Sequence, residues 1–577
     1  MSKIQVEVRF TDKLESIRVG GQDMEIPNAI KTKSVEEWFE PAAGRVNWDG
    51  LGAEIKAMDF SDEKNAVYSF QFNGPEDKKQ EFMKCVRDHG LGEEAQQETQ
   101  EETEQDYLQD ASDFQQVGNA EMAFQKYMVA ASEYGRPDAQ LEVARCYQNG
   151  TGVEKNEENA VVWYKKAAEQ GYAEAQKKLG DCYNYGTGVA KDLEQAFECY
   201  RKAAEQGNAR AQNNLGVCYM NGNGVTKDPV QAAEWYARAA EQGLARAQYN
   251  LGYCYKTGEG VEKDPKKAAM WCEKAAEQGI AVAQNSIGYC YDTGFGVEKD
   301  TSKAVFWYRK AAEQGNVGAQ YKLGKCYYYG KGTEKDNEEA VKWFRKAAEQ
   351  GDADAQYKLG LFYENGYGVA QNKEEAVKWY RKSAEQGYAD AQYNLAELLY
   401  NVAGFLSWKD GEEAFKWYQK AAKQGHAGAQ DSLGLCYEET DMEMEIYWGM
   451  GMGVEKDSAK AVEWYRKAAE QGLDSAQYHL GRCYEGGKGV TKDLTKAAEW
   501  YQKAAEQGLG SAQYQLGRCY EGGHGVTKDL TKAAEWYQKA ADKGYDKKLL
   551  QGCDVGSAVA AGAALAATGL IWKILRG

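Results

Sequence analysis

Cysteine is the residue type whose number and spacing first suggest chemistry in this sequence. The chain has 13 cysteines. Nine of them recur at one position of a repeated segment: Cys146, Cys182, Cys218, Cys254, Cys290, Cys326, Cys436, Cys483 and Cys519. A metal site needs close pairs such as Cys-x-x-Cys, which the sequence lacks, and Phe362 and Leu398 take the same position in two other segments. We therefore predict reduced, buried core thiols, with no metal and no cofactor.

Histidines and glycine-rich loops are the other candidates for chemistry. The four histidines, His89, His426, His479 and His524, are scattered, and we expect them at the surface or in loops. The GxGVxKD segments superficially resemble phosphate-binding loops, but they lack the preceding strand and the G-K-[ST] ending. Because they recur in nearly every repeat, their expected role is to turn the chain. No catalytic residue is predicted, and the favoured class is a non-enzymatic protein.

The elements that position these residues come from a repeat of 36 residues. A phrase close to KAAEQG returns with its glycine at Gly135, Gly171, Gly207, Gly243, Gly279, Gly315, Gly351, Gly387, Gly425, Gly472, Gly508 and Gly544. Nine of the eleven intervals are 36 residues long, and the other two are 38 and 47. Such periodicity is typical of an array of stacked units that bury a shared core.

Residues 244–279 illustrate the predicted fold of one unit. The segment ARAQYNLGYCYKTG carries apolar residues at helical spacing. Gly258 and Gly260 can adopt positive φ and turn the chain after this helix. Asp264 is a good N-cap for a second helix that begins with a proline. Gly252, inside the first helix, suggests that another helix passes close to the backbone there. Each unit is therefore predicted to be a helix–turn–helix hairpin with one apolar face.

The repeated phrase AQYxLGxCYxxGxGVxKDxxKAxxWYxKAAEQG resembles the Sel1-like repeat family, relatives of the tetratricopeptide repeat. The resemblance covers residues 136–544 in eleven units. It implies a right-handed α-superhelix that serves as an adaptor for protein complexes. The predicted fold is therefore mainly α: a right-handed α-solenoid of about eleven Sel1-like helix–turn–helix repeats, with a small N-terminal α+β domain.

Four segments flank the repeats. Residues 1–90 carry no repeat; KIQVEVRF and AVYSFQF alternate as strands do and GPEDKKQEFMKCVRDHG is predicted to be helical, which gives a small α+β domain of unknown role. Residues 91–105 are an acidic, Gln-rich linker. Residues 106–135 are an incomplete helix pair, predicted to cap the array. Residues 545–577 form an apolar tail rich in Ala and Gly.

The tail has two interpretations that the sequence leaves open. Residues 555–572 carry no charge and would span about 27 Å as a helix, close to the thickness of a hydrocarbon core. They would then anchor the array to a membrane. Alternatively, they cap the last repeat or stay disordered. A face of small residues at Ala558, Gly562 and Ala566 would also suit self-association. The start of the chain has no apolar run, so a cytoplasmic location is expected, with membrane attachment only under the first interpretation.

Positions that vary between repeats, while the frame stays constant, are the candidate binding residues. In tetratricopeptide-like arrays the first helices line the concave face. The predicted partner-binding positions on them are Lys178, Asp181, Asn214, Val217, Asn250, Tyr253, Ser286, Tyr289, Lys322, Lys325, Lys358 and Leu361. This mixture of Asn, Tyr and Lys suits an extended peptide, although an ordinary solvated face is the alternative.

An insertion of about eleven residues interrupts the unit 426–472. Its apolar residues include Met442, Met444, Tyr447 and Trp448. Insertions in repeat arrays emerge on one face. The segment is therefore predicted either to dock a partner or to form a lid on its own array.

The charge balance narrows the class of partner. The net charge is -18 and the sequence pI is about 5.1, which argues against nucleic acid because binding it needs clustered Lys and Arg. The expected partners are one or more proteins or extended peptides. Two alternative functions remain open: an enzyme whose chemistry lies in residues 1–90 with the repeats as a substrate arm, and an effector that engages a host protein.

Overall fold

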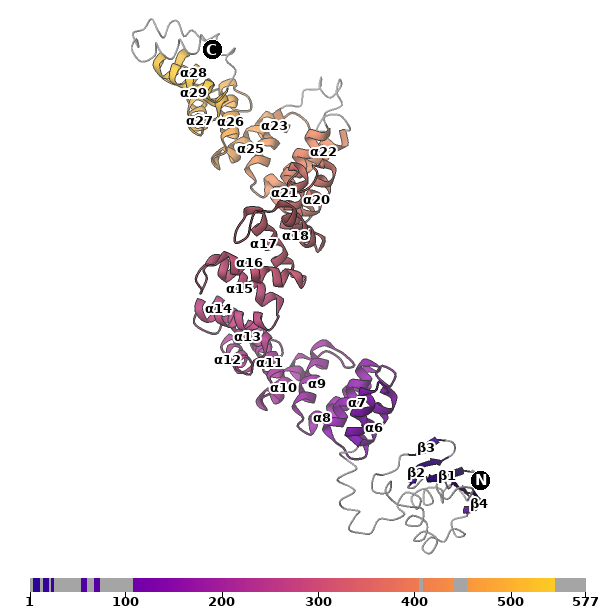
Figure 1. Cartoon of the computed structure of the whole chain (residues 1–577). Coiled ribbons are helices and arrows are strands. Elements are labelled where there is room, and N and C mark those ends of the chain that lie inside the picture. The colour runs from indigo at the N-terminus through magenta and orange to yellow at the C-terminus, as the bar shows by residue number, and fades with distance from the viewer. Residues whose placement is uncertain are drawn as a thin grey trace. The chain divides into compact units, whose positions relative to one another are not determined.

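The computed structural model describes the strands within residues 4–72 as backbone, and residues 107–403, 408–438 and 454–544. Helices dominate the last three ranges (Figure 1). The first helices of the repeats are α7 (Pro137–Asn149), α9 (Ala173–Tyr185), α11 (Ala209–Asn221), α13 (Ala245–Thr257), α15 (Ala281–Thr293), α17 (Val317–Tyr329), α19 (Ala353–Asn365), α21 (Ala389–Ala403), α23 (Ala427–Glu438), α26 (Asp474–Gly486) and α28 (Gly510–Gly522). The chain is mainly helical, as predicted.

Each first helix is followed by a second helix of similar length. These are α8 (Glu157–Glu169), α10 (Leu193–Glu205), α12 (Pro229–Glu241), α14 (Pro265–Glu277), α16 (Thr301–Glu313), α18 (Asn337–Glu349), α20 (Lys373–Glu385), α22 (Trp408–Lys423), α25 (Ser458–Glu470), α27 (Leu494–Glu506) and α29 (Leu530–Asp542). Residues 107–116 are also helical and are followed by α6 (Ala120–Ser132). The predicted helix–turn–helix unit is therefore confirmed.

Local signals set the helix ends as expected. After α13, Gly258 and Gly260 adopt φ values of 84° and 75°. The Asp264 carboxylate accepts a hydrogen bond from the Lys267 backbone N–H, so it caps α14. Gly279 follows the end of α14 with a φ of 90°. Because each signal lies within the same unit of 36 residues, every unit can form its hairpin locally.

Close packing explains the glycine inside the first helices. A Cβ atom at Gly252 would lie 3.0 Å from the Cys272 Sγ atom of α14, and one at Gly180 would lie 2.7 Å from a ring carbon of Tyr200. The prediction that another helix passes close to these glycines is confirmed. The repeated cysteines form no disulfide and are buried. Phe362 and Leu398, which take the same position in two repeats, are also buried. Their predicted role as apolar core residues is also confirmed.

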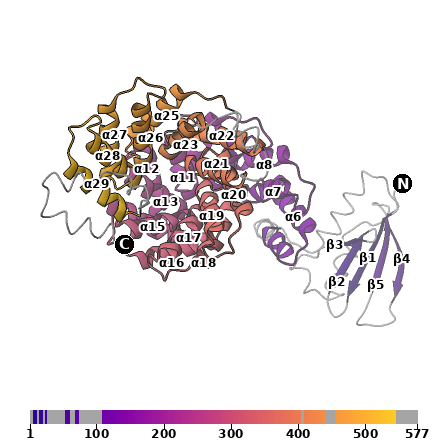
Figure 2. The same ribbon diagram turned by 90° about the horizontal axis from the view of Figure 1, so that it is seen from above.

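The chain divides into two compact units, residues 1–227 and 228–577, which are described separately. Within each unit, second helices pack on the first helix of the next repeat, for example α8 on α9 and α14 on α15. In Figure 2 the pairs from α15 to α27 follow one another around a common centre, with the first helices nearer that centre. The repeats thus form a solenoid, and its predicted right-handedness stays a prediction.

Strands in residues 4–72 form an antiparallel sheet. They are β1 (Ile4–Phe10), β2 (Leu14–Val19), β3 (Gln22–Met24), β4 (Ala53–Asp59) and β5 (Val67–Phe72), in the order β3-β2-β1-β5-β4. The two strands predicted from sequence correspond to β1 and β5. The helix predicted at residues 74–90 lies outside the described residues, so the α+β character of this region stays a prediction.

Three other predicted segments also lie outside the described residues. They are the linker 91–105, residues 439–450 of the insertion and the tail 545–577. The described part of the chain contains no helix long and apolar enough to cross a membrane. The open question about residues 555–572 is therefore not addressed by the structure.

Candidate functional site

The predicted binding positions share one face of the first helices. Lys178, Asn214, Asn250, Ser286, Lys322 and Lys358 occupy one repeat position, and the other six lie three residues later, which is about one helical turn on the same side. All twelve are half-buried or exposed; the exposed fractions of Tyr253 and Tyr289 reach 47% and 38%. Asn214 and Val217 lie in the first compact unit, and those from Asn250 onward lie in the second.

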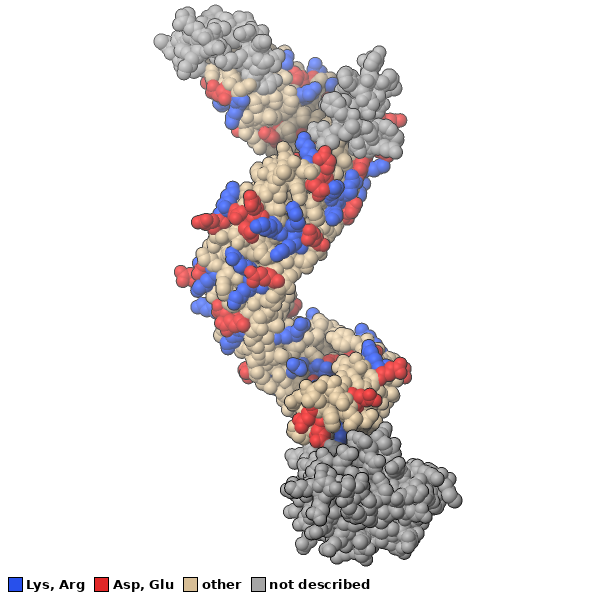
Figure 3. Space-filling view, turned by 45° about the vertical axis from the view of Figure 1, so that its right-hand side comes forward, with Lys and Arg blue, Asp and Glu red and all other residues tan. Residues whose placement is uncertain are grey.

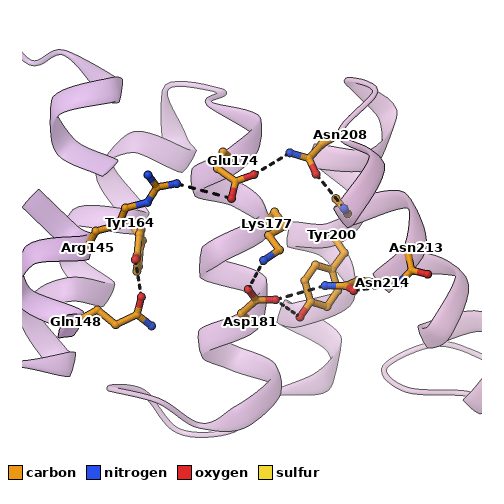
Figure 4. Close-up of polar contacts among 11 residues, drawn as sticks. Arg145, Gln148, Tyr164, Glu174, Lys177, Asp181, Tyr200, Asn208, Asn213 and Asn214 are labelled. Carbon is orange, nitrogen blue, oxygen red and sulfur yellow. Dashed lines mark hydrogen bonds and ion pairs between the residues drawn. The ribbon is translucent and has the colours of Figure 1, made fainter. Parts of the chain in front are cut away.

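A carboxylate organises this face in the first unit (Figure 4). Asp181 on α9 accepts a hydrogen bond from Lys177 Nζ at 2.7 Å and from the Tyr200 hydroxyl of α10 at 2.9 Å. The Asn214 side-chain amide of α11 donates to the same carboxylate at 3.4 Å. We call these four residues the Asp181 cluster. Its carboxylate is supplied by the chain itself, so the donors around it are satisfied.

Neighbouring charged residues in the first unit also pair with one another. Arg145 pairs with Glu142 at 2.7 Å and approaches Glu174 at 4.0 Å. The Asn208 side chain donates to Glu174 at 3.0 Å (Figure 4). Charges on this part of the face therefore largely neutralise one another.

The middle repeats present the same positions with different side chains. Asn285, Tyr289, Tyr308 and Lys322 lie three repeats after Lys177, Asp181, Tyr200 and Asn214 respectively. We call them the Tyr289 cluster. Lys322 Nζ donates to the Asn285 side-chain oxygen at 3.2 Å and lies 5.1 Å from the centre of the Tyr289 ring. The position of the organising carboxylate is thus held by an aromatic ring.

A second lysine faces the same ring. Lys256 Nζ lies 5.1 Å from the centre of the Tyr289 ring, and Lys322 Nζ also lies 5.3 Å from the Tyr308 ring. Burial lowers the pKa of Lys322, and the charge of Lys256 lowers it further, whereas Asp292 raises it. Within the described residues, neither Lys256 nor Lys322 forms an ion pair.

The hydroxyl of Tyr308 differs from its equivalents. In other repeats the corresponding tyrosine donates to an acceptor on the first helix: Tyr164 to Gln148, Tyr380 to Glu364, Tyr418 to Glu397, Tyr465 to Glu438, Tyr501 to Glu485 and Tyr537 to Glu521. Tyr308 is fully buried, and its hydroxyl has no hydrogen-bond partner among the described residues. Cys272 and Phe344, which carry no hydroxyl, replace the tyrosine in the two adjacent repeats.

A buried amide ladder holds the face in register. The Gln248 side chain donates to the Ala240 carbonyl at 3.3 Å and accepts from Gln278 at 2.8 Å. Gln176 and Gln206 make the equivalent contacts in the first unit. These contacts join consecutive helices and satisfy buried polar groups. Sequence reasoning missed them, although a glutamine retained at one position within an apolar helix face was an available signal.

Several expectations about single residues have a definite outcome. His426 lies in the turn before α23, where it accepts from the Ala429 N–H, and His524 lies in an exposed loop, so both agree with the expectation. His479 does not, because it lies within α26 with its Nδ1 atom 2.8 Å from Asp431. Burial raises the pKa of the Cys182 and Cys254 thiols to about 11, which keeps them protonated and unreactive at neutral pH. The described ranges contain no group of side chains arranged to hold a metal ion.

Not every predicted residue joins the clusters. Met442, Met444, Tyr447 and Trp448 lie outside the described residues. Lys325 and Lys358 each lie over a tyrosine of their own helix, with Nζ 5.4 Å from the Tyr321 ring and 5.3 Å from the Tyr357 ring. The lysine most relevant to the Tyr289 cluster, Lys256, was not among the predicted residues.

Comparisons with known proteins agree with this architecture. The Sel1 repeat profile matches residues 137–172, 173–208, 209–244, 245–280, 281–316, 317–352, 353–388, 389–426, 447–473, 474–509 and 510–545. The chain is similar to the crystal structure of a protective antigen from uropathogenic Escherichia coli that displays an SLR fold, with 39% identity, a TM-score of 0.68, and coverage of 78% of this chain and 92% of the antigen.

A second solved relative is a Sel1 repeat protein from Oxalobacter formigenes, with 36% identity and a TM-score of 0.39. That match covers 42% of this chain and 96% of the relative. No match was found among curated proteins. Since the repeat profile covers most of the sequence, the chain belongs to the Sel1 repeat family.

Proposed function

We propose that this protein is a non-enzymatic adaptor that binds extended segments of partner proteins along the first helices of its repeats. Solenoids of Sel1 repeats are generally protein-interaction scaffolds. The main support is the contrast between a constant frame and a variable face. Alanines, glycines and the glutamine ladder recur in the frame, whereas the face carries Asn, Ser, Tyr and Lys at two positions per repeat.

The chemistry of this face suits an extended peptide. Amide and hydroxyl side chains can pair with peptide N–H and C=O groups that leave water. Exposed tyrosines such as Tyr253 and Tyr289 offer large contact areas at a small cost in side-chain entropy. Because the helices carrying them are stacked on a close-packed core, the face is ordered before binding, which lowers the entropic cost of association.

Selection from a random peptide display library would test this function. The full chain should enrich peptides, and replacing Asn214, Asn250, Tyr253 and Tyr289 with alanine should abolish that enrichment without unfolding the array. The control replaces four exposed residues of the second helices, Val162, Val230, Met270 and Phe306, with alanine. Equal enrichment by the wild type and the first-helix variant would refute the proposed face.

The tail and the insertion extend the proposal from sequence alone. Residues 555–572 would tether the adaptor to a membrane, and residues 438–448 would add a docking segment. Carbonate-resistant membrane association that disappears on removal of residues 555–577 would support the tether. Unchanged peptide capture after deletion of residues 438–448 would exclude the docking role. The readings as an enzyme or as an effector remain predictions that no contact described above favours.

A further inference from the structure

We propose that the Tyr289 cluster, with Lys256 beside it, is a docking site for an acidic peptide segment whose carboxylates take the place that Asp181 fills in the first unit. The proposal rests on the proposed adaptor function and names the chemistry of the partner. It follows from comparing two clusters that occupy the same four positions of the repeat.

The two clusters occupy equivalent positions of the repeat. In the Asp181 cluster, an ammonium group, a buried tyrosine hydroxyl and a side-chain amide all donate to one carboxylate. In the Tyr289 cluster, the same three positions hold the Asn285 amide, the buried Tyr308 hydroxyl and the Lys322 ammonium. The donors are of the same kind, but Tyr289 stands where Asp181 lies in the first unit. Asp292 occupies the position of the tyrosine acceptors Glu364, Glu485 and Glu521, yet it accepts no hydrogen bond from the Tyr308 hydroxyl in the described ranges.

The Tyr289 ring is faced by two positive charges. Lys256 and Lys322 come from different repeats, and their Nζ atoms each lie 5.1 Å from the centre of the same ring. The charge of Lys256 acts on Lys322, and two like charges repel unless an anion lies close by. Asp292 is the nearby acid, but it forms no ion pair with Lys322 in the described part of the chain. The lowered pKa of Lys322 agrees with an ammonium group that lacks an anionic partner.

Lys256 and Lys322 differ from other lysines of the described surface. Several lysines on the second helices pair locally with acids, as Lys342 does with Glu339 and Lys378 with Glu375. Lys and Arg also lie among Asp and Glu over the visible face of the repeats (Figure 3). In a chain of net charge -18, Lys178, Lys325 and Lys358 on this face also form no ion pair within the described ranges. Lys256 and Lys322 differ from them because both face one aromatic ring, that of Tyr289. Complementary charge therefore favours an acidic partner.

The aromatic rings favour a peptide over a small anion. Tyr289 and Tyr253 lie at the same repeat position in consecutive repeats and are both exposed. They offer apolar contact beside the lysines, which a free phosphate would not use. A nucleic acid would need many more cations along its path.

Binding of a fluorescein-labelled, amidated octaglutamate peptide to the full chain tests the proposal. Fluorescence anisotropy should detect binding of this peptide, whereas the octaglutamine peptide should not bind. The Lys256→Gln/Lys322→Gln double variant should weaken the affinity about tenfold. Arg482→Gln/Arg518→Gln is the matched control, because it removes the same charge from the same face of α26 and α28 and should change the affinity less than about twofold.

A third variant distinguishes binding at this site from non-specific electrostatic attraction of the peptide. Tyr289→Asp would install the internal carboxylate and satisfy the donors, so octaglutamate binding should disappear while the fold is retained. Tyr289→Asn, which adds no charge, should retain most of the binding. Circular dichroism would verify folding of each variant.

Several outcomes would overturn the proposal. They are no binding of octaglutamate, an equal loss in the Arg482/Arg518 control, equal binding of a single-stranded oligonucleotide, or full displacement by inorganic phosphate. Library enrichment of peptides without an excess of Glu and Asp would also refute the acidic preference while the adaptor function stands. A library without any enrichment would instead refute the adaptor function.

Discussion

The Asp181 and Tyr289 clusters occupy the same four positions of the repeat and differ in whether the chain supplies its own carboxylate. In the first unit the Asp181 carboxylate accepts hydrogen bonds from three donors, which are thereby satisfied within the chain. In the middle repeats Tyr289 stands at that position, and the Tyr308 hydroxyl keeps no partner among the described residues. The same packed helix pairs can therefore carry a face whose polar groups are hydrogen-bonded within the chain or a face where a polar group lacks a partner.

The largest effect we expect is a loss of stability when the close packing of the helix pairs is disrupted. The loss should be similar in the repeats that carry the two clusters. A Cβ atom at Gly188 would overlap the Glu157 carbonyl oxygen, and one at Gly296 would overlap that of Pro265. Alanine at either position should lower the free energy of unfolding by about 3 kcal/mol or more, through backbone clash and positive φ. Urea unfolding would measure the loss.

Alanine at Gly207 is the control for that prediction. Its φ is also positive, at 90°, but no atom lies within 4 Å of the added Cβ. The loss there should be about 1 kcal/mol. Markedly different losses at Gly188 and Gly296 would mean that the two regions do not share one frame.

Removing the side chain at position 181 or at the equivalent position 289 should change the free energy of unfolding by different amounts. Asp181→Ala leaves the buried Tyr200 hydroxyl and Lys177 without their acceptor, so it should lower the free energy of unfolding by about 1–3 kcal/mol. Tyr289→Ala removes an exposed ring and should cost about 0.5 kcal/mol or less. Thermal unfolding of both variants would measure the difference. Equal losses would contradict the distinction between a closed and an open cluster.

Removing the tyrosine hydroxyl should give effects of opposite sign. Tyr200→Phe loses a hydrogen bond to Asp181 and should lower the free energy of unfolding by about 1 kcal/mol. Tyr308→Phe removes a buried hydroxyl without a described partner, so stability should stay unchanged or rise by about 1 kcal/mol. Urea denaturation of the two variants checks the signs. A clear loss for Tyr308→Phe would show that its hydroxyl is satisfied.

The smallest expected effect concerns pH. Because the pKa of Lys322 lies below its ordinary value of 10.5, the unfolded chain binds this proton more tightly than the folded chain. The protonated lysine therefore lowers stability at neutral pH, and this cost disappears as pH rises towards 10.5. Lys322→Gln should raise Tm by about 1 °C at pH 7, and the difference should shrink at high pH.

Lys178→Gln is the matched variant for that measurement, because Lys178 occupies the same repeat position in the first unit. It corrects for the loss of any lysine at this place on the helix. A Tm difference for Lys322→Gln that stays constant from pH 7 to the alkaline range would contradict the proposed cause.

Much of the architecture could be predicted because its determinants are local. The N-cap at Asp264 and the turn at Gly258 and Gly260 act within a few residues of one another. The cysteine position could be assigned to the core because Phe362 and Leu398 replace cysteine there. The predicted positions on the first helices also lie on a half-buried or exposed face, as their spacing implied.

The composition of the clusters was harder to predict because each joins side chains from several helices. Lys256 was not predicted because it lies three residues beyond Tyr253, outside the two positions per repeat that were selected as variable. The position of His479 has a similar cause, because Asp431, the residue it contacts, lies 48 residues away in the sequence. Contacts between side chains of different repeats form only when stacking brings those repeats close enough together.

The sequence by itself determined the helix pairs, their period and their buried alanine, leucine and cysteine positions, since caps, glycines and apolar spacing act within one repeat. Only the tertiary structure decided which polar side chains meet, because stacking brings together residues far apart in the sequence. Lys322 and Asn285 are 37 positions apart, and Tyr200 and Asp181 are 19 positions apart. Whether a carboxylate is present at that meeting point separates a closed face from an open one.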